Sequence, residues 1–255
     1  MPASEQNEST RKSALVTGSQ SGLGAGMAVG LAEAGANVVV HGKDATGIDE
    51  VCAAVRAAGA RAARAEGDVS QPGVCEELVE LTVREFGSID ILINNAGIIR
   101  RAPAAEFSAR DWNDVLEVNL NAVFRLCQAA GRHMLAQGSG KIINVASLLS
   151  FQGGVFVPSY AAAKGAVAQL TKALANEWAG KGIQVNAIAP GYMATDNTAA
   201  LRADPVRTRQ ILERIPAGRW GTPRDLAGTA VFLASTAGDY VNGHVLVVDG
   251  GWLAR

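Results

Sequence analysis

Short runs of apolar, β-branched residues alternate along this chain with longer alanine-rich stretches that have helical periodicity. The apolar runs fall at residues 14–17, 37–41, 90–94, 141–146, 183–189 and 244–248. The helical stretches fall at 22–34, 44–58, 72–86, 109–137, 159–179 and 223–235. Nearly continuous apolar strands belong to a sheet that is buried on both faces. The alternation therefore predicts an α/β fold, a single-domain, Rossmann-like, doubly wound parallel sheet with helices on both faces.

Capping signals support several of these helix boundaries. Ser108 precedes the fourth helical stretch, and Asp111 follows it at the spacing of a capping box. Pro72, Pro158 and Pro223 each stand where a first helical turn is expected, a position that tolerates proline because the N–H has no partner there.

Residues 192–222 interrupt the rhythm, since this connection is longer and more charged than the others and contains two prolines. Ligands of doubly wound sheets bind outside the carboxyl ends of the strands, and this segment follows such an end. We therefore expect an irregular insert here that acts as a lid over a substrate.

The bulk composition excludes several classes of protein. The chain has 255 residues, 48% of them hydrophobic, and a formal net charge of −1, which suits one large core and indicates no nucleic-acid partner. No apolar run is long enough to span a bilayer and no signal segment is visible, so we expect a cytoplasmic protein with no membrane partner. Residues 1–11 are polar and are expected to form a disordered tail before one domain at 12–255.

The spacing of cysteines and histidines argues against a metal site. The three cysteines form no CxxC pair, so neither a thiolate site nor a disulfide framework is expected. His41, His133 and His244 are far apart and lack the spacing of metal ligands. We expect these histidines to be structural or solvent-exposed, and we expect no catalytic metal.

A glycine-rich stretch, TGSQSGLGAG, follows the first apolar run. Gly18, Gly22 and Gly24 stand at a G-x-x-x-G-x-G spacing between a strand and a helix. Glycines there permit a tight turn and a close approach of the backbone to a pyrophosphate, which the start of the helix then binds. This context predicts a dinucleotide site, and a glycine-rich turn without a ligand is the alternative.

The residues that follow the second and third strands bear on the choice of cofactor. An acidic residue after the second strand would bind the ribose 2′-hydroxyl of NAD, but this position holds Gly42, followed by Lys43. A lysine can meet the 2′-phosphate of NADP, or it can be an ordinary solvated loop residue. Asp68, in GDVS after the third strand, can contact the adenine edge or cap the next helix.

The stretch PSYAAAKGA places Tyr160 and Lys164 four residues apart on an expected helix. That spacing puts the two side chains on one face, a turn apart. An ammonium beside a phenol favours the phenolate, so we expect Lys164 to lower the pKa of Tyr160 and make it a usable acid or base. The alternative is a pair of amphipathic surface side chains.

Polar residues also stand at the ends of two further strands. The run at 90–94 leads into NNAG, and Ser147 follows the run at 141–146. Asn119 lies inside a helical stretch, where a buried amide needs a partner, and it could bond the backbone or a water near a catalytic lysine. The ordinary alternatives are a capping serine and a helix-interior asparagine.

These motifs occur in a characteristic order along the chain. Taken together, Thr17-Gly-x3-Gly-x-Gly, Asn-Asn-Ala-Gly, Asn119, Ser147, Tyr160-x3-Lys164 and Pro-Gly at 190–191 resemble the short-chain dehydrogenase/reductase family over essentially residues 11–255. The resemblance implies that Tyr160 is the catalytic acid/base and that Lys164 lowers its pKa and holds the nicotinamide ribose. It also implies that Ser147 polarises the reacting oxygen and that Asn119 anchors a water of the proton relay.

The same resemblance implies a nicotinamide cofactor and a homotetramer, with contact surfaces on the helices at 109–137 and 159–179 and on the terminal strand. It favours NAD slightly, whereas Lys43 favours NADP, so the choice stays open. The implied cofactor contacts are Gly18, Ser21, Gly22, Leu23, Gly24, Lys43, Asp68, Val69, Asn95, Ala96, Gly97, Tyr160, Lys164, Pro190, Gly191, Met193 and Thr195, the last to the carboxamide.

Several stretches, among them NNAGIIRR, SLLSFQGG, RIPAGRWG and DGGWLAR, resemble the branch of the family that acts on deoxy-keto sugar acids. Such a small-molecule substrate carries a carboxylate, which a bidentate arginine binds best. Candidates are Arg100, Arg101 and Arg219, while Gln152 could bond a sugar hydroxyl; solvated loop residues or a structural ion pair are the alternatives. Three competing functions remain: a gluconate 5-dehydrogenase, a 3-oxoacyl-thioester reductase, and a nucleotide sensor that catalyses no reaction.

Overall fold

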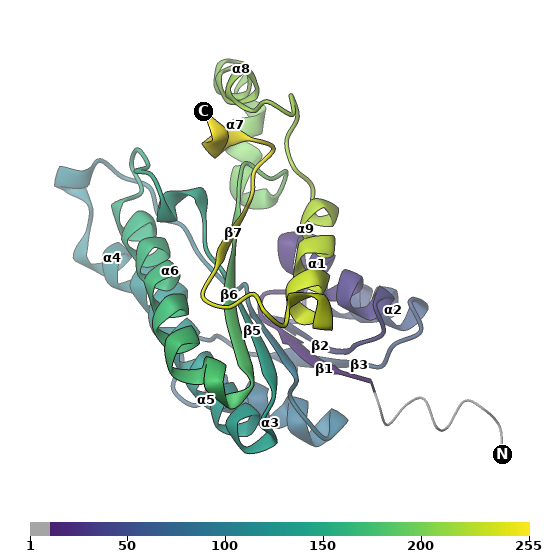
Figure 1. The fold of residues 1–255 in the computed structure, drawn as a ribbon. Helices are drawn as coiled ribbons and strands as arrows, with labels where there is room; N and C mark the ends of the chain where they lie inside the picture. Colours follow the sequence, from purple (N-terminus) through teal and green to yellow (C-terminus); the bar gives the residue numbers. More distant parts are fainter. Residues whose placement is uncertain (1–10) are drawn as a thin grey trace.

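The computed structural model describes residues 11–255, so the expected tail at residues 1–11 lies outside the described part except for Arg11. Seven parallel strands form one sheet in the order β3-β2-β1-β4-β5-β6-β7 (Figure 1). The strands are β1 (Ser13–Val16), β2 (Asn37–Gly42), β3 (Ala62–Glu66), β4 (Ile91–Asn94), β5 (Gly140–Val145), β6 (Ile183–Pro190) and β7 (Val245–Val248). This is the doubly wound sheet that the sequence predicts, and all six apolar runs form strands.

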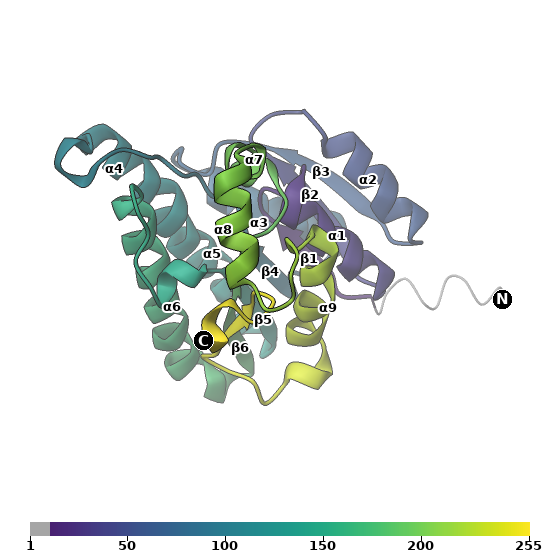
Figure 2. The same ribbon diagram turned by 90° about the horizontal axis from the view of Figure 1, so that it is seen from above.

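Helices cover both faces of this sheet (Figures 1 and 2). One face carries α1 (Gly22–Glu33), α2 (Ile48–Ala57) and α9 (Pro223–Ala234), and the other carries α3 (Val74–Phe86), α5 (Ala122–Gln137) and α6 (Pro158–Trp178). Alternate residues of one strand serve the two cores: Val16 packs with the first group and Leu15 with the second. Within residues 11–255, no helix combines the length and apolar character that crossing a bilayer requires.

The predicted boundaries hold with local exceptions. Pro158 and Pro223 begin their helices, and the Ser108 hydroxyl accepts a hydrogen bond from the backbone N–H of Asp111 at 3.0 Å, as predicted for a cap. The expectation for Pro72 is wrong, because Gly73 takes a left-handed conformation (φ 83°) and α3 begins only at Val74.

Three other features differ from the predicted pattern. β3 is an edge strand with one buried residue, so it carries no apolar run. The helix predicted over 109–137 contains a π-turn, residues 117–121, between α4 (Ala109–Leu116) and α5. The segment at 192–222 is largely helical rather than irregular, with α7 (Ala199–Ala203) and α8 (Pro205–Arg214) above the carboxyl ends of the strands (Figure 1).

Helices α1 and α9 pack closely enough that side chains are excluded where they cross. A Cβ atom at Gly30 would lie 2.7 Å from the Cβ of Ala227, and one at Gly26 would lie 2.7 Å from Pro223. These distances are well inside van der Waals contact. The first turn of α1 borders the cavity described below, so this crossing helps to place one wall of it.

We expect Gly30→Ala to lower the free energy of unfolding by about 1–3 kcal/mol, because the added methyl group forces the two helices apart. Gly228→Ala, on the outer face of α9 with no atom near the added Cβ, is the matched control. It is expected to raise stability by roughly 0.5–1 kcal/mol through helix propensity. Chemical denaturation measures both, and equal effects of the two changes would contradict the packing argument.

Candidate active site

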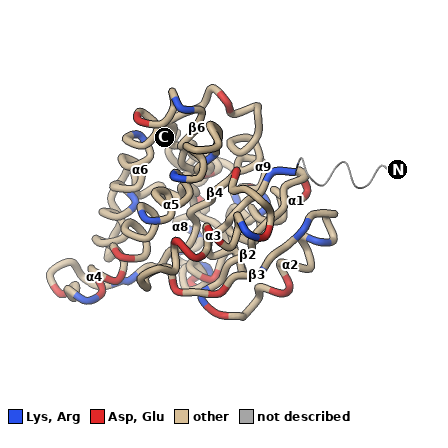
Figure 3. Tube along the Cα trace, turned by 90° about the horizontal axis from the view of Figure 1, so that it is seen from below, with Lys and Arg blue, Asp and Glu red and all other residues tan. Residues whose placement is uncertain are grey.

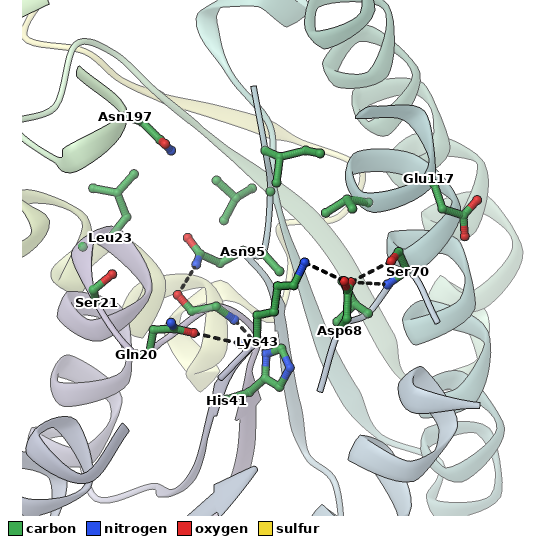
Figure 4. Close-up of a pocket in the computed structure, with 18 of the residues that line it drawn as sticks. Gln20, Ser21, Leu23, His41, Lys43, Asp68, Ser70, Asn95, Glu117 and Asn197 are labelled. Atoms are coloured by element: carbon green, nitrogen blue, oxygen red, sulfur yellow. Dashed lines mark hydrogen bonds and ion pairs between the residues drawn. The ribbon is translucent and has the colours of Figure 1, made fainter. Parts of the chain in front are cut away.

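A cavity of about 710 Å³ opens at the carboxyl ends of the strands, where doubly wound folds bind ligands (Figure 4). It gathers most of the residues that the sequence predicts as cofactor contacts. The predicted contacts that line it are Gly18, Ser21, Gly22, Leu23, Lys43, Asp68, Val69, Asn95, Ala96, Gly97, Tyr160, Lys164 and Thr195. The remaining ones, Gly24, Pro190, Gly191 and Met193, lie outside its lining.

The glycine turn has the geometry that a pyrophosphate requires. Gly18 and Gly22 have positive φ angles of 61° and 56°, and a Cβ at Gly24 would overlap the Gly18 carbonyl oxygen. Ser21 is the N-cap residue of α1, and its side chain accepts no hydrogen bond from the first N–H groups of the helix. The first N–H groups of α1 and its positive dipole end therefore face the cavity and suit a phosphate.

Two side chains hold this turn in place from neighbouring strands. The Asn95 amide donates to the carbonyls of Thr17 and Gly18 at 2.9 and 3.0 Å. His41 Nδ1 accepts from the Gly18 N–H at 3.0 Å, so its Nε2–H donates to the Gly67 carbonyl at 2.9 Å. Burial lowers the pKa of His41 and keeps it neutral, as this bonding requires. His41 is thus structural, one of the roles expected for it.

Lys43 and Asp68 form an ion pair of 2.8 Å across the adenosine end of the cavity (Figure 4). Burial opposes ionisation of Asp68, but hydrogen bonds from Lys43 and Ser70 outweigh it and lower its pKa to about 2. A Cβ at Gly42 would overlap the Gln20 amide oxygen, which accepts from the Lys43 N–H at 2.9 Å. The position that an NAD-binding carboxylate would take is therefore filled by Gln20.

Lys164 is buried, with 3% of its surface exposed, and its Nζ donates to the Val145 carbonyl at 2.5 Å. Burial lowers the pKa of this ammonium to about 8. The Val145 carbonyl lies at the end of β5, two residues before Ser147. One contact therefore joins α6 to the strand end that carries the serine.

Tyr160 lies one turn before Lys164, with the ammonium 5.6 Å from the centre of its ring. Burial raises the pKa of the phenol, while the Ser147 hydroxyl and the charge of Arg101 act against the rise. The expectation that Lys164 lowers this pKa is not met in the free protein, because desolvation dominates and the ammonium is directed at Val145. Tyr160 is therefore a protonated phenol at neutral pH.

Asn119 sits in the π-turn and is fully buried. Its amide donates to the Ile98 carbonyl and accepts from the Ile98 N–H, both at 2.8 Å. The side chain is therefore occupied in joining the π-turn to the loop after β4, one of the roles predicted for it. Single π-turns inside helices are frequent at functional sites.

The four candidate substrate contacts fall in different places. Arg101 donates to the Asn197 carbonyl at 3.4 Å and lies near enough to Tyr160 to affect its pKa. Arg100 lines the cofactor cavity and pairs with Asp111. Arg219 is held by both carboxylate oxygens of Asp225 at 2.8 and 2.7 Å, the structural ion pair that stood as its alternative. Gln152 contacts the C-terminal segment, described below.

The sequence pattern did not single out Gln20, Glu117 or Asn197, which also line the cavity, or Arg214 and Trp252, which contact Gln152. Gln20 stands inside the glycine motif, and Arg214 and Trp252 stand in the stretches RIPAGRWG and DGGWLAR, so these three could have been noticed there. Glu117 and Asn197 belong to no motif of their own. Within residues 11–255, no group of three or more His, Cys, Asp or Glu side chains is arranged to hold a metal ion.

Comparison with known proteins finds relatives along nearly the whole chain. A family model described as enoyl-(acyl carrier protein) reductase matches residues 18–253. The chain is 57% identical over 245 residues to the 2-dehydro-3-deoxy-D-gluconate 5-dehydrogenase of Dickeya dadantii, covering 96% of each chain. It is 48% identical over 238 residues to the gluconate 5-dehydrogenase of Gluconobacter oxydans, covering 93% of each.

Two solved structures extend this likeness to the fold. A crystal structure from Agrobacterium tumefaciens, described as a candidate 2-deoxy-D-gluconate 3-dehydrogenase with bound NADP, superposes with a TM-score of 0.90 at 56% identity and covers 96% of this chain and 97% of its own. A gluconate 5-dehydrogenase from Burkholderia cenocepacia in complex with NADP and tartrate gives a TM-score of 0.91 at 42% identity, covering 98% and 100%.

The half-buried Tyr160 phenol gives a prediction that needs no substrate. In an ultraviolet pH titration, the phenolate of Tyr160 is identified as the absorbance that is lost in Tyr160→Phe. This absorbance should develop at a pH above the ordinary tyrosine pKa of about 10, because burial raises the pKa of this phenol. Tyr240→Phe, which removes a fully exposed ring, is the control. A Tyr160 phenolate already present at neutral pH would contradict this description of the site.

Proposed function

Since this chain belongs to the short-chain dehydrogenase/reductase family, we propose that it interconverts a hydroxyl and a keto group on a deoxy-keto sugar acid. The reaction is the oxidation of the C5 hydroxyl of 2-dehydro-3-deoxy-D-gluconate, or the reduction of the corresponding 2,5-diketo acid. The observation that supports the chemistry is that Tyr160 and Lys164 line the dinucleotide cavity, with the Ser147 hydroxyl beside the Tyr160 phenol. The substrate class is supported by relatives of that name at 54–57% identity.

The cavity suits a nicotinamide dinucleotide, which supplies the acceptor or donor of the hydride. The glycine turn and the start of α1 would hold its pyrophosphate, and Thr195 borders the space for the nicotinamide end. NADP is the proposed partner, because Gln20 fills the place of a ribose-binding carboxylate and Lys43 offers a cation for the 2′-phosphate. Relatives of known structure with bound NADP support this choice.

Tyr160 acts as the proton donor to the keto oxygen during reduction, and as the proton acceptor during oxidation. Its raised pKa keeps it protonated at neutral pH, which favours reduction. The Ser147 hydroxyl, beside Tyr160 in this structure, donates to the same substrate oxygen and stabilises the charge that develops there. The Lys164 ammonium, fixed on Val145, stabilises the phenolate after the proton has left.

Arg101 is the proposed partner of the substrate carboxylate. Its guanidinium donates to the Asn197 carbonyl and lies near enough to Tyr160 to affect its pKa, so an acid bound to it would lie close to the phenol. The guanidinium can bind a carboxylate through two parallel hydrogen bonds. Arg219 is left out of the proposal because Asp225 already uses both of its forked nitrogens.

The competing functions are less well supported by the site. A reductase of carrier-bound acyl thioesters needs a basic mouth to receive an acidic carrier, but the cavity lining mixes Lys43, Arg100 and Lys164 with four carboxylates. Basic and acidic residues are likewise interspersed over the rest of the described chain (Figure 3). A nucleotide sensor has no need of the complete set of catalytic side chains. Gluconate remains the nearest rival substrate, because relatives of that name are 44–48% identical.

A homotetramer is also proposed. Trp112 on α4 and Phe124 on α5 are large apolar side chains that stay 38% and 44% exposed. They lie on the helical surface, residues 109–137, that the family resemblance assigns to subunit contact. Exposed aromatic side chains on one surface favour an interface.

The reaction is tested by initial rates with 2,5-diketo-3-deoxygluconate and NADPH. Wild-type protein should turn the acid over, and Tyr160→Phe should lower kcat by roughly a hundredfold to ten-thousandfold, since it removes the proton donor. Tyr240→Phe serves as the control for a lost phenol. Turnover by the wild type that survives in Tyr160→Phe would remove Tyr160 from its role, and no wild-type turnover would remove the substrate.

The cofactor preference is tested by Lys43→Ala. The KM for NADPH should rise roughly tenfold to a hundredfold, the range of a lost charge-assisted hydrogen bond, while the KM for NADH should stay unchanged. Lys172→Ala, which removes an exposed lysine of α6, is the control. Equal changes for both cofactors would show that Lys43 does not meet the 2′-phosphate.

The carboxylate contact is tested by Arg101→Gln. The KM for the sugar acid should rise roughly tenfold to a hundredfold because a charged partner is lost, with the KM for NADPH unaffected. Arg110→Gln, an arginine of α4 whose side chain is 90% exposed, controls for loss of charge alone. An unchanged KM for the acid would exclude Arg101 from carboxylate binding.

A further inference from the structure

The last residues of the chain lie against the lid helix α8 (Figures 1 and 2). Arg255 donates through Nε to the Arg214 carbonyl at 3.2 Å and through a terminal nitrogen to the Glu213 carbonyl at 2.5 Å. The final carbonyl groups of a helix lack partners within the helix. The C-terminal arginine therefore completes the end of α8 and fixes it to the tail.

Trp252, in the short helical turn Trp252–Ala254, connects this tail to the catalytic loop. Its side chain is 5% exposed and packs in one cluster with Ile211 and Ile215 of the α8 region and with Leu148. Leu148 directly follows the catalytic Ser147. The ring of Tyr192, just after β6, lies 4.6 Å from the indole ring. One indole thus bridges the catalytic turn, the lid and the end of β6.

The Gln152 amide is oriented by this cluster. Its Oε1 accepts from the Trp252 indole N–H at 3.2 Å and from an Arg214 guanidinium nitrogen at 3.4 Å, and the guanidinium stacks 4.0 Å above the indole ring. Both neighbours can only donate, so the amide oxygen must face them. The amide nitrogen is therefore on the side of the carboxamide away from these two donors, and within residues 11–255 it donates no hydrogen bond.

Gln152 is also fixed to the turn that begins at Ser147, because its backbone N–H donates to the Leu148 carbonyl at 3.1 Å. Gln152 therefore belongs to the turn that begins at Ser147, and its amide nitrogen has two hydrogens to donate. Hydroxyl, keto and carboxylate oxygens of a sugar acid are the acceptors that match them.

We propose that Trp252 and Arg214 are positioning residues that set the Gln152 amide so that its nitrogen donates to an oxygen of the sugar acid. This deepens the proposed function and rests on it. The C-terminal tail and α8 would then both contribute to substrate recognition, because both orient the Gln152 side chain.

The test is a double-mutant cycle between Gln152→Met and Trp252→Phe. Each single change should raise the KM for the acid roughly threefold to tenfold, the range of one lost hydrogen bond, and leave the KM for NADPH unchanged. The double variant should be no worse than Gln152→Met alone, because Trp252 acts through Gln152. Arg214→Met should behave like Trp252→Phe, whereas Arg207→Met, on an exposed residue of the same helix, should have no effect.

An NMR measurement and the choice of substrate separate this proposal from a packing role and from the proposed function. In the nitrogen-proton spectrum of the free protein, the indole signal that disappears in Trp252→Phe should shift in Gln152→Met, which a purely packing role would not produce. The cycle can use any keto acid that the wild type reduces, including 5-keto-D-gluconate, so lack of activity on the deoxy acid would count against the proposed function alone. Additive effects at residues 152 and 252, or an unchanged KM in Gln152→Met, would overturn the positioning proposal.

Discussion

The structure depends on a buried cation at the end of the central sheet. A doubly covered parallel sheet offers few polar partners in its interior, and an ammonium placed there loses its hydration. The Lys164 ammonium regains a hydrogen-bond partner by donating to the carbonyl of Val145, the last residue of β5. Because Lys164 lies inside α6, this contact sets where that helix stands relative to β5. Tyr160, one turn earlier, and Ser147, two residues beyond Val145, take their places from it.

The opposite end of the cavity is held by a second set of neutral contacts. His41 accepts from the glycine turn and donates to Gly67, which joins the ends of β1, β2 and β3. Asn95 fastens the same turn to the end of β4. The dinucleotide site is therefore rigid along the sheet edge before any ligand binds. Tyr160, Lys164 and Ser147 lie along the same sheet edge, and we propose that α8 and the C-terminal residues add the part that recognises the substrate.

Periodicity and motif spacing predicted the sheet, most helix boundaries and the Tyr160–Lys164 pair, because each is encoded within a short stretch of chain. Features set by distant residues were missed. The late start of α3 is a local exception, because Gly73 adjoins Pro72 in the chain. Arg219 looked available for a substrate until Asp225 appeared as its partner. The pKa of Tyr160 was predicted in the wrong direction because burial cannot be read from spacing.

The central claim is that a charged Lys164 supports proton transfer by a neutral Tyr160. It is tested most directly by the pH dependence of kcat/KM for 2,5-diketo-3-deoxygluconate, measured with saturating NADPH, because this ratio reports ionisations of the enzyme before the acid binds. Reduction should slow as the pH rises through the Lys164 pKa of about 8, because the ammonium then loses its charge. A rate that stays level across that pH would contradict it.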